Sequence, residues 1–332
     1  MNLPPGESFE PFRHRLPWLG PDLQTLRDTL RSPRQSPERG EPVLVDVGSG
    51  DRLLGWLDPP EQGEPLALVL VVPGLGGTAD SMGVRRLSLA LRGAGLAVLR
   101  LNLRGAGAGR TLAKGTYAAQ CNSDLLPVLQ RARQLAKGRP LAAVGLSLGG
   151  TMLLNVVLAQ GQLDALVCLS SPLDLAACIA QIEQFRNRPY ERWLTRRLCH
   201  QTLADPFGVS EPERLALSGP RRPTRIRQFD ALITAPRWHY RSVEHYYAEV
   251  SPLPQLLRQP GGLPPTLVVH AQDDPWVPVA GANALAQARL PGLEVLLPRR
   301  GGHNGFHAVG DGPAGCWSDR ITAHWLGQRV GG

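Results

Sequence analysis

Residues 145–149 read Gly-Leu-Ser-Leu-Gly and fit the pattern Gly-x-Ser-x-Gly around a candidate serine nucleophile. The pentapeptide follows an apolar run that predicts a buried strand (141–146), and it opens a helical pattern. So sharp a turn between strand and helix strains the serine backbone and brings neighbouring chain too close for side chains at the glycine positions. A serine can also simply cap the following helix. The strand-turn-helix setting favours Ser147 as a nucleophile.

A serine hydroxyl is a weak nucleophile at neutral pH and needs a basic imidazole that a carboxylate orients. Around this motif, the acid and the histidine follow the serine along the chain in that order. Asp273 and Asp274 follow one predicted strand (266–271), and His303 lies in a glycine-flanked loop after the next strand. Because parallel strands end at one edge of a sheet, we expect these side chains to meet Ser147 there.

Asp274 is the preferred acid of the pair, because it lies three residues past the predicted strand end and opens an Asp-x-x-Val-Pro turn. Asp273 is then a turn residue, although both aspartates could simply initiate a turn. His303 is the preferred histidine because it lies on the shorter path from the preceding strand. The alternatives are His307 in the same loop and His324 in the terminal helical pattern.

The backbone N–H groups of Leu75 and Leu148 are the predicted donors to an oxyanion. Acyl transfer needs such donors, usually the N–H after the nucleophile and one N–H from the loop after an earlier strand. Leu148 follows the serine, and Leu75 lies in the loop Pro-Gly-Leu-Gly-Gly (73–77) after the predicted strand 66–72. Because the donors are backbone groups, the side chains at these positions matter little.

The same loop supports a competing enzyme hypothesis, an NADP-binding oxidoreductase. Residues 74–79 read Gly-Leu-Gly-Gly-Thr-Ala and fit the Gly-x-Gly-x-x-Ala pattern of dinucleotide-binding proteins. Arg104, after the next predicted strand, could meet the 2′-phosphate of the cofactor. However, the dinucleotide loop normally follows the first strand of its domain, whereas a predicted hairpin precedes this one. Short glycine patterns also arise easily by chance, so a hydrolase is favoured.

Apolar runs typical of strands buried on both faces recur along most of the chain. They lie at 43–47, 53–57, 66–72, 96–103, 141–146, 165–170, 266–271 and 293–298. The first two runs flank a Gly-Ser-Gly-Asp turn and predict a hairpin. Amphipathic segments between the later runs predict crossover helices. We therefore expect an α/β fold with a doubly wound, mostly parallel sheet.

This strand pattern stops between about residues 171 and 265, where Trp, Tyr, Arg and Pro replace Val and Leu. Two stretches within this segment, 177–184 and 190–203, have helical spacing. The segment therefore predicts a helical cap inserted into a larger unit. The predicted organisation is an N-terminal extension (1–42), an α/β core (43–170 and 266–332) and the helical cap insertion (171–265).

Composition excludes several classes of protein. The 332 residues are 42% hydrophobic and 19% charged, which fits neither a disordered chain nor a coiled coil. Five cysteines without a Cys-x-x-Cys pair indicate neither a disulfide framework nor a zinc site. Together with an N-terminus that lacks the apolar region of a signal peptide, they predict a cytoplasmic protein. Residues 140–163 are uncharged, but Gly, Ser and Gln interrupt them, so we expect no transmembrane segment.

The net charge is +8, and nearly all of the positive charge is arginine. Without lysine clusters or a nucleic-acid-binding motif, this enrichment does not indicate binding of nucleic acid. Residues 181–241 hold twelve Arg against six Asp or Glu, together with several aromatic residues. An apolar cap surface rimmed by arginine could make peripheral contact with a lipid membrane. Alternatively, the arginines pair with the cap's own acids and the aromatics pack between its helices.

Several motifs together resemble the α/β-hydrolase fold and, more narrowly, its YheT-like branch of ABHD-type esterases and lipases. Besides residues 145–149, the matching segments are Trp18-Leu19 with 23–26, 99–105, 228–230, Tyr246-Tyr247, 271–275 and 301–306. The resemblance runs almost end to end. The chain departs from the pattern at Pro73, where a His-Gly pair is common, at Asp22, where His is usual, and at 118–121, where relatives resemble His-x-Gly-Glu.

The resemblance implies a triad of Ser147, Asp274 and His303 and the hydrolysis of carboxylic esters, of short-chain or acylglycerol type, through an acyl-enzyme. The expected substrate is thus a small-molecule ester or a lipid, and no metal or organic cofactor is implied. Acyl transfer to an alcohol or thiol would use the same residues. A binding protein that kept the fold and lost turnover is the non-enzymatic alternative. The oligomeric state stays open.

Overall fold

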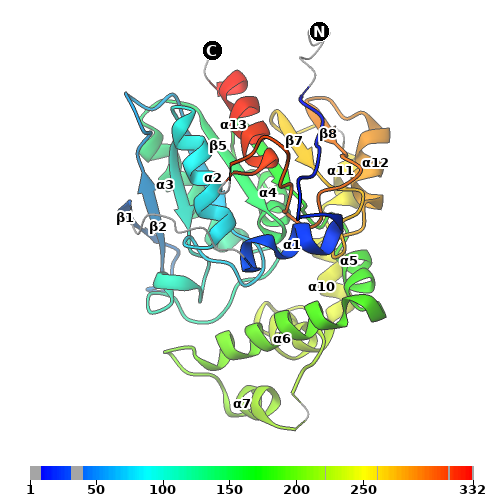
Figure 1. Ribbon diagram of the computed structural model, residues 1–332. Helices are drawn as coiled ribbons and strands as arrows, with labels where there is room; N and C mark the ends of the chain where they lie inside the picture. The colour runs from blue at the N-terminus through cyan, green and yellow to red at the C-terminus, as the bar shows by residue number, and fades with distance from the viewer. Residues whose placement is uncertain (1–8, 31–39, 221, 260, 313–314, 331–332) are drawn as a thin grey trace.

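The computed structural model describes residues 9–30, 40–220, 222–259, 261–312 and 315–330. Within these ranges a sheet lies between two layers of helices, and a further group of helices lies beyond the carboxyl ends of the strands (Figure 1). The predicted N-terminal extension falls partly outside the described residues, at 1–8 and 31–39.

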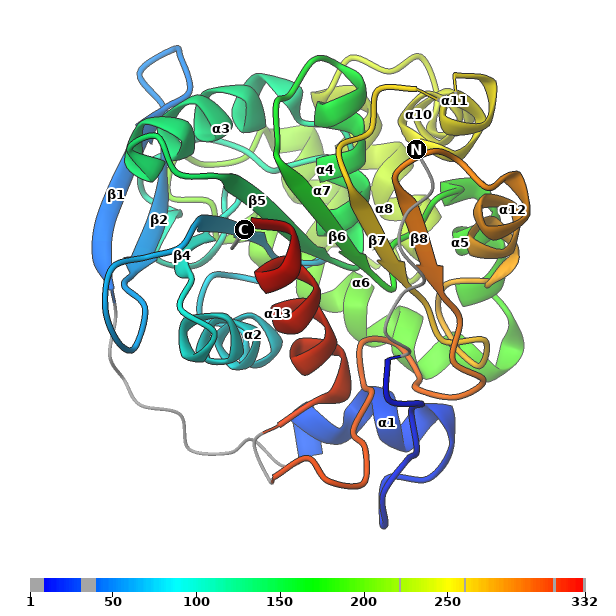
Figure 2. The same cartoon turned by 90° about the horizontal axis from the view of Figure 1, so that it is seen from above.

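The sheet brings distant parts of the chain side by side (Figure 2). In the described part of the chain, its strand order is β1-β2-β4-β3-β5-β6-β7-β8. The strands are β1 (Glu41–Asp46), β2 (Arg52–Asp58), β3 (Leu68–Val72), β4 (Ala97–Leu101), β5 (Leu141–Leu146), β6 (Ala165–Leu169), β7 (Thr266–Val269) and β8 (Leu293–Leu296). β1 pairs antiparallel with β2, and β2 antiparallel with β4, whereas the remaining neighbours are parallel.

The strand order reverses at β3. From β3 the chain crosses to β4 on one side and later returns to β5 on the other side. In open α/β sheets, the carboxyl ends of strands at such a reversal form the usual ligand-binding crevice. The ends of β3 and β5 are therefore where a site is expected.

Helices cover both faces of the sheet, which explains why its strands read as almost continuous apolar runs. α2 and α13 lie on one face, and α3, α4 and α12 on the other (Figure 2). Their bounds are α2 (Met82–Gly93), α3 (Asn122–Ala136), α4 (Leu148–Leu158), α12 (Ala280–Ala288) and α13 (Trp317–Val330). Along β3, Leu68, Leu70 and Val72 join the core cluster of one face, and Val69 and Val71 join that of the other.

The structure confirms the predicted fold class and all eight predicted strands. Several predicted runs, 96–103 and 266–271 among them, are longer than the strands that form within them, here β4 and β7. The reason is that Leu103 and Ala271 stay buried after the chain has left the sheet. An apolar run indicates burial, and burial continues past the carboxyl end of a strand into the loop that follows it.

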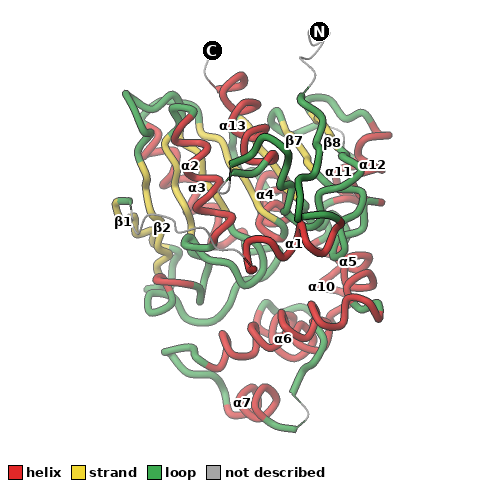
Figure 3. The backbone as a smooth tube through the Cα atoms, in the orientation of Figure 1, coloured by secondary structure: helices red, strands yellow, loops and turns green. Residues whose placement is uncertain are grey.

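The segment 171–265, which we call the cap segment, is helical throughout its regular structure in the described residues (Figure 3). Its helices are α5 (Leu175–Ile182), α6 (Arg188–Leu203), α7 (Glu211–Ser218), α8 (Ile226–Phe229), α9 (Ala235–Arg237), α10 (Val243–Val250) and α11 (Leu253–Arg258). The helical stretches predicted at 177–184 and 190–203 correspond to α5 and α6. Pro at the start of α6 and α7 suits the first turn of a helix, where its missing N–H is not needed.

The two ends of the described chain lie close together. His14 forms an isolated antiparallel bridge with Ala308, and α1 (Gly20–Leu30) packs beside the loop 301–308 (Figure 1). Among the helices of the described ranges, none combines the length and the apolar character that crossing a membrane requires.

Candidate active site

Ser147 lies on a sharp turn between β5 and α4, with φ of 52° and ψ of −124°. This is a sparsely populated backbone region for any residue with a side chain, so the surrounding structure must hold it. A Cβ at Gly145 would lie 2.2 Å from the backbone nitrogen of Gly150, and one at Gly149 would lie 2.3 Å from the carbonyl oxygen of Val72. Only glycine fits at these positions, which is the physical content of the Gly-x-Ser-x-Gly pattern.

Three of the predicted site residues meet at the ends of β5, β7 and β8. Nε2 of His303 lies 2.9 Å from Oγ of Ser147, and Nδ1 of His303 lies 2.8 Å from Oδ2 of Asp274. The second carboxylate oxygen of Asp274 accepts the backbone N–H groups of Trp276 and Val277, at 2.8 and 2.9 Å. Asp274 is thus fixed by its own loop and presents one oxygen to the imidazole.

The two neighbouring aspartates differ in what they face. Burial alone would raise the pKa of Asp274, but the facing His303 ring and its hydrogen bond offset this, and the pKa lies below its usual value. Burial and then the charge of Asp274 raise the pKa of Asp273. Oδ1 of Asp273 accepts the N–H of Gly302 at 2.9 Å, so this residue braces the histidine loop.

The structure places the two alternative histidines elsewhere. His307 is only 1% exposed, and its Nε2 lies 3.8 Å from Oδ1 of Asp28. Burial, and then the nearby charge of Arg86, lower the pKa of His307 to about 3. His324 is exposed on α13 and contacts the ring of Phe9. Of the candidate histidines in these loops, His303 is the one in hydrogen-bond contact with Ser147.

The low pKa of His307 makes the stability of the fold depend on pH. Below its ordinary pKa of 6.5, the unfolded chain binds a proton that the folded chain does not bind until about pH 3. The free energy of unfolding therefore falls as the pH falls through this window, by about 1.4 kcal/mol per unit. We expect His307 to contribute a loss of roughly 2 to 3 kcal/mol between pH 7 and pH 4.5.

Urea unfolding at both pH values measures this loss. The variant His307→Gln, which cannot titrate, should lose less stability on acidification than the wild type, whatever its stability at pH 7. His324→Gln is the matched control and should behave like the wild type. Equal losses in His307→Gln and the wild type would contradict the assignment.

The predicted oxyanion donors lie beside the serine. Leu148 is the first residue of α4, where a backbone N–H has no acceptor within the helix. Leu75 belongs to the loop after β3, and a Cβ at Gly74 would lie only 3.0 Å from the Cβ of Ser147. Oη of Tyr117 accepts the N–H of Gly76 at 2.5 Å and holds this loop in place. Both leucines line the cavity that contains the serine.

The arginine that could meet the phosphate of a dinucleotide, Arg104, is bonded to acids of the protein itself. Nε and a terminal nitrogen of Arg104 donate to the two carboxylate oxygens of Asp124, at 2.9 and 2.7 Å, and a further nitrogen pairs with Asp51. This guanidinium is engaged within the protein. Among the residues that the structure describes, no group of three or more His, Cys, Asp or Glu side chains is arranged to hold a metal ion.

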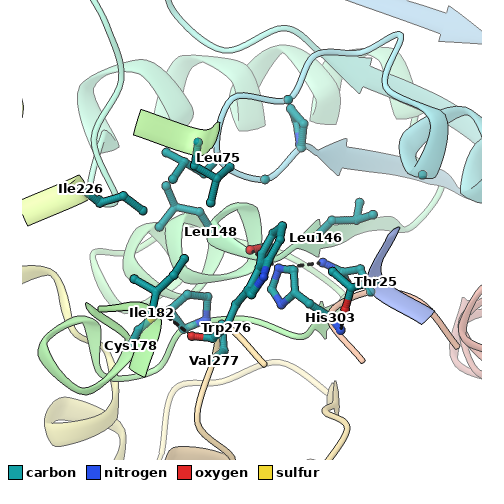
Figure 4. A pocket seen from close by; sticks show the side chains of 18 of the residues that line it. Thr25, Leu75, Leu146, Leu148, Cys178, Ile182, Ile226, Trp276, Val277 and His303 are labelled. Atoms are coloured by element: carbon teal, nitrogen blue, oxygen red, sulfur yellow. Dashed lines mark hydrogen bonds between the residues drawn. The ribbon is translucent and has the colours of Figure 1, made fainter. Parts of the chain in front are cut away.

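A cavity of about 290 Å³ opens beside Ser147 (Figure 4). Figure 4 shows Thr25 and His303 on one side and Ile182 and Ile226 on the other. The cap segment supplies much of the apolar lining, namely Leu175, Ile179, Ile182, Leu194 and Ile226. A polar nucleophile next to such an apolar wall suits a substrate with a polar reacting group and an apolar chain.

Sequence reasoning assigned no role to Trp276 and Asp230, which both line this cavity. Trp276 stacks its ring at 4.6 Å from that of His303. Asp230 lines the cavity and accepts hydrogen bonds from the hydroxyls of Thr234 and Tyr247, at 2.7 and 2.8 Å. Burial raises the pKa of Asp230 to about 6. The available signals were the 228–230 motif and the position of Trp276 two residues after Asp274.

Comparisons with known sequences identify the family of this chain. Residues 67–308 match the family profile described as alpha/beta hydrolase fold. YheT of Escherichia coli, named as a candidate esterase, is 30% identical over 266 residues, which cover 79% of this chain and 77% of that protein. The mouse phospholipase ABHD3 is 28% identical over 79% of this chain and 64% of its own length.

Solved structures of low sequence identity share the fold. A 2,6-dihydroxy-pseudo-oxynicotine hydrolase superposes with a TM-score of 0.58 at 18% identity, covering 93% of this chain and 72% of that one. The esterase domain of a Rhodothermus marinus protein gives 0.56 at 20% identity, covering 88% of this chain and 99% of that one. The resemblance predicted from the sequence motifs is confirmed, and this chain belongs to the α/β hydrolase fold family.

Proposed function

We propose that the protein is a serine hydrolase that cleaves carboxylic esters through Ser147, His303 and Asp274. The observation that carries this proposal is the unbroken hydrogen-bonded line from Oδ2 of Asp274 through His303 to Oγ of Ser147, at 2.8 and 2.9 Å. The line ends on a strained turn beside an apolar cavity. Relatives named as a candidate esterase and a phospholipase support ester bonds as the target.

In the proposed reaction, Nε2 of His303 takes the proton of Ser147 as Oγ attacks the ester carbonyl carbon. The N–H groups of Leu75 and Leu148 hold the negative charge that develops on the carbonyl oxygen. Asp274 keeps the ring oriented and stabilises its positive charge. The imidazolium then returns the proton to the departing alcohol, and an acyl group stays on Ser147. Water, activated by the same imidazole, releases the acid and restores the serine.

We further propose that the cap segment (171–265) is an insertion that covers the site of a core formed by 43–170 and 266–332. Side chains of α5, α6 and α8 close the cavity above the serine with apolar surface. This lining suits the acyl part of a short-chain or acylglycerol-type ester.

All five cysteines are free thiols, which supports the prediction of a reducing, cytoplasmic environment.

The proposal is tested with a serine-directed phosphonate and a series of p-nitrophenyl esters of increasing acyl length. We expect one adduct, mapped to Ser147, and turnover whose kcat/KM depends on acyl length. A protein that forms no adduct and turns over none of the esters would contradict the proposal.

We also propose that the outer face of α6 makes peripheral contact with lipid. Phe185, just before this helix, is 81% exposed and Trp193 is 48% exposed. The guanidinium groups of Arg188 and Arg197 lie 5.1 and 5.6 Å from these two rings. Aromatic rings flanked by arginine are suited to an anionic lipid surface.

The arginines that pair with acids of the cap segment lie outside α6, on α7, α8 and α9, which weakens the alternative of a fully paired cap surface. Arg214 and Arg237 hold Glu211 and Glu213 of α7. On α6, Arg192 and Arg196 are exposed and four residues apart on one face.

Vesicle binding tests the lipid contact. The wild type should co-sediment with vesicles of anionic lipid at low salt and be released at high salt, because salt screens exposed charges within about 10 Å at 0.1 M. The double variant Arg192→Glu/Arg196→Glu should bind at least about tenfold more weakly. Arg131→Glu/Lys137→Glu on the core is the control with the same change of charge and should bind like the wild type. Absence of binding at low salt, or equal binding of both variants, would contradict the contact.

A further inference from the structure

The short helix α1 is fastened to the loop that carries His303. Oγ1 of Thr25 accepts the backbone N–H of His303 at 2.9 Å and donates to the carbonyl of Pro21 at 2.7 Å. Gln24 is 1% exposed, and its amide bonds both backbone groups of His307, accepting the N–H at 2.7 Å and donating to the oxygen at 3.1 Å. Two adjacent side chains of α1 thus form hydrogen bonds with the backbone at both ends of the loop from His303 to His307.

The backbone of the loop 301–308 lies in close contact with the backbone of α1. A Cβ at Gly302, where φ is +60°, would lie 2.5 Å from the carbonyl oxygen of Pro21 and 2.8 Å from Oγ1 of Thr25. A Cβ at Gly305 would lie 2.6 Å from the carbonyl oxygen of Gln24. The loop approaches α1 so closely only because both positions are glycine.

α1 is also anchored to the cap segment. Asp22 accepts a hydrogen bond from the hydroxyl of Tyr190 at 3.0 Å and pairs with Arg186, also at 3.0 Å. Tyr190 in turn packs edge-on against Trp276, whose ring lies beside His303. Because α1 is held from the cap as well as from the loop, it can hold the loop in place instead of moving with it.

We propose that α1 is a brace for the reacting imidazole and that Thr25 and Gln24 are positioning residues for His303. This proposal rests on the proposed hydrolase function. Neither residue needs to touch the reacting atoms. Thr25 accepts the backbone N–H of His303 and Gln24 holds the backbone of His307, so that the ring keeps its distance to both Ser147 and Asp274. Displacement of a reacting group by about 1 Å can cost on the order of 100-fold in rate.

The decisive variants are Thr25→Val and Thr25→Ser. Valine keeps the shape of threonine but removes the acceptor of the His303 N–H, whereas serine keeps the acceptor. We expect Thr25→Val to lower kcat by roughly tenfold to 100-fold with KM changed less than about twofold, because ring placement is affected while valine keeps the shape that Thr25 gives to the cavity wall. Thr25→Ser should restore kcat to within about threefold of the wild type. Thr266→Val, which removes a threonine hydroxyl bonded to Pro264 at the start of β7, is the control and should keep wild-type kcat.

A second readout does not depend on turnover. The proton on Nδ1 of His303, shared with Asp274, should give a far-downfield proton NMR signal in the wild type and in Thr25→Ser, and a broadened or lost signal in Thr25→Val. The proposed positioning role of α1 is contradicted if Thr25→Val keeps both kcat and this signal, or if Thr25→Ser fails to restore them. If the wild type hydrolyses no ester, the proposed function fails, and the NMR signal alone then decides whether α1 positions the ring.

Discussion

Ser147→Ala should abolish ester turnover, with kcat reduced on the order of 10⁴-fold or more, and should remove the phosphonate adduct. The variant lacks the oxygen that attacks the carbonyl, and Nε2 of His303 is left without a proton to take. The fold should persist, because serine and alanine both carry a Cβ, so the substitution adds no strain to the φ of 52° that residue 147 already adopts. Ester assays, adduct mapping and thermal melting together measure these expectations.

Ser123→Ala on α3 is the matched control, since it removes a serine hydroxyl from a helix on the core and should keep wild-type turnover. Wild-type turnover in Ser147→Ala, with melting temperature unchanged, would show that another residue is the nucleophile. The serine hydrolase proposal would then be wrong even though the geometry around Ser147 is intact.

Asp274→Asn is expected to lower kcat by about 10³-fold to 10⁴-fold. The reason is geometric. Oδ1 of residue 274 accepts the N–H groups of Trp276 and Val277, so the asparagine oxygen must occupy that place. The amide NH₂ is then directed at Nδ1 of His303, which must become an acceptor. The ring proton moves to Nε2, and the imidazole can no longer accept the proton of Ser147.

Asp273→Asn is the control from the neighbouring position. Its Oδ1 accepts the N–H of Gly302, and an asparagine oxygen can do the same, so kcat should change by no more than a few-fold. Steady-state kinetics of both variants against one p-nitrophenyl ester make the comparison. A large loss in Asp273→Asn and a small one in Asp274→Asn would reverse the assignment within the pair.

The elements that the sequence predicts well are those governed by local pattern. A strand buried on both faces needs an apolar residue at every position, so β3 and β5 are visible as runs of Val, Leu and Ala. The turn at Ser147 is visible because two glycines are required at fixed offsets from the serine. Asp274 could be preferred over Asp273 by its place in the turn. The N–H groups of Trp276 and Val277, which fix Asp274 through Oδ1, are visible only in the folded structure.

The parts that the sequence did not predict depend on contacts between distant segments. Gln24 and Thr25 belong to the 23–26 segment that resembles the family, but the backbone groups that they bond lie 283 and 278 positions further along the chain, so the segment alone does not show what its side chains do. Asp230 reads as an ordinary cap acid until the folded cap segment buries it beside the cavity. Trp276 faces His303 only because the loop after β7 turns back over the site.

The bonds between α1 and the histidine loop join the beginning of the chain to a segment near its other end. Thr25 and His303 are 278 positions apart, and Gln24 and His307 are 283 apart. Contacts of such separation form late, because closing the intervening loop costs conformational entropy before any contact offsets it. A chain still on the ribosome can build the turn that displays Ser147 long before His303 has been translated. On the proposed function, the nascent chain would therefore be inert toward esters until His303 has been translated and has joined α1.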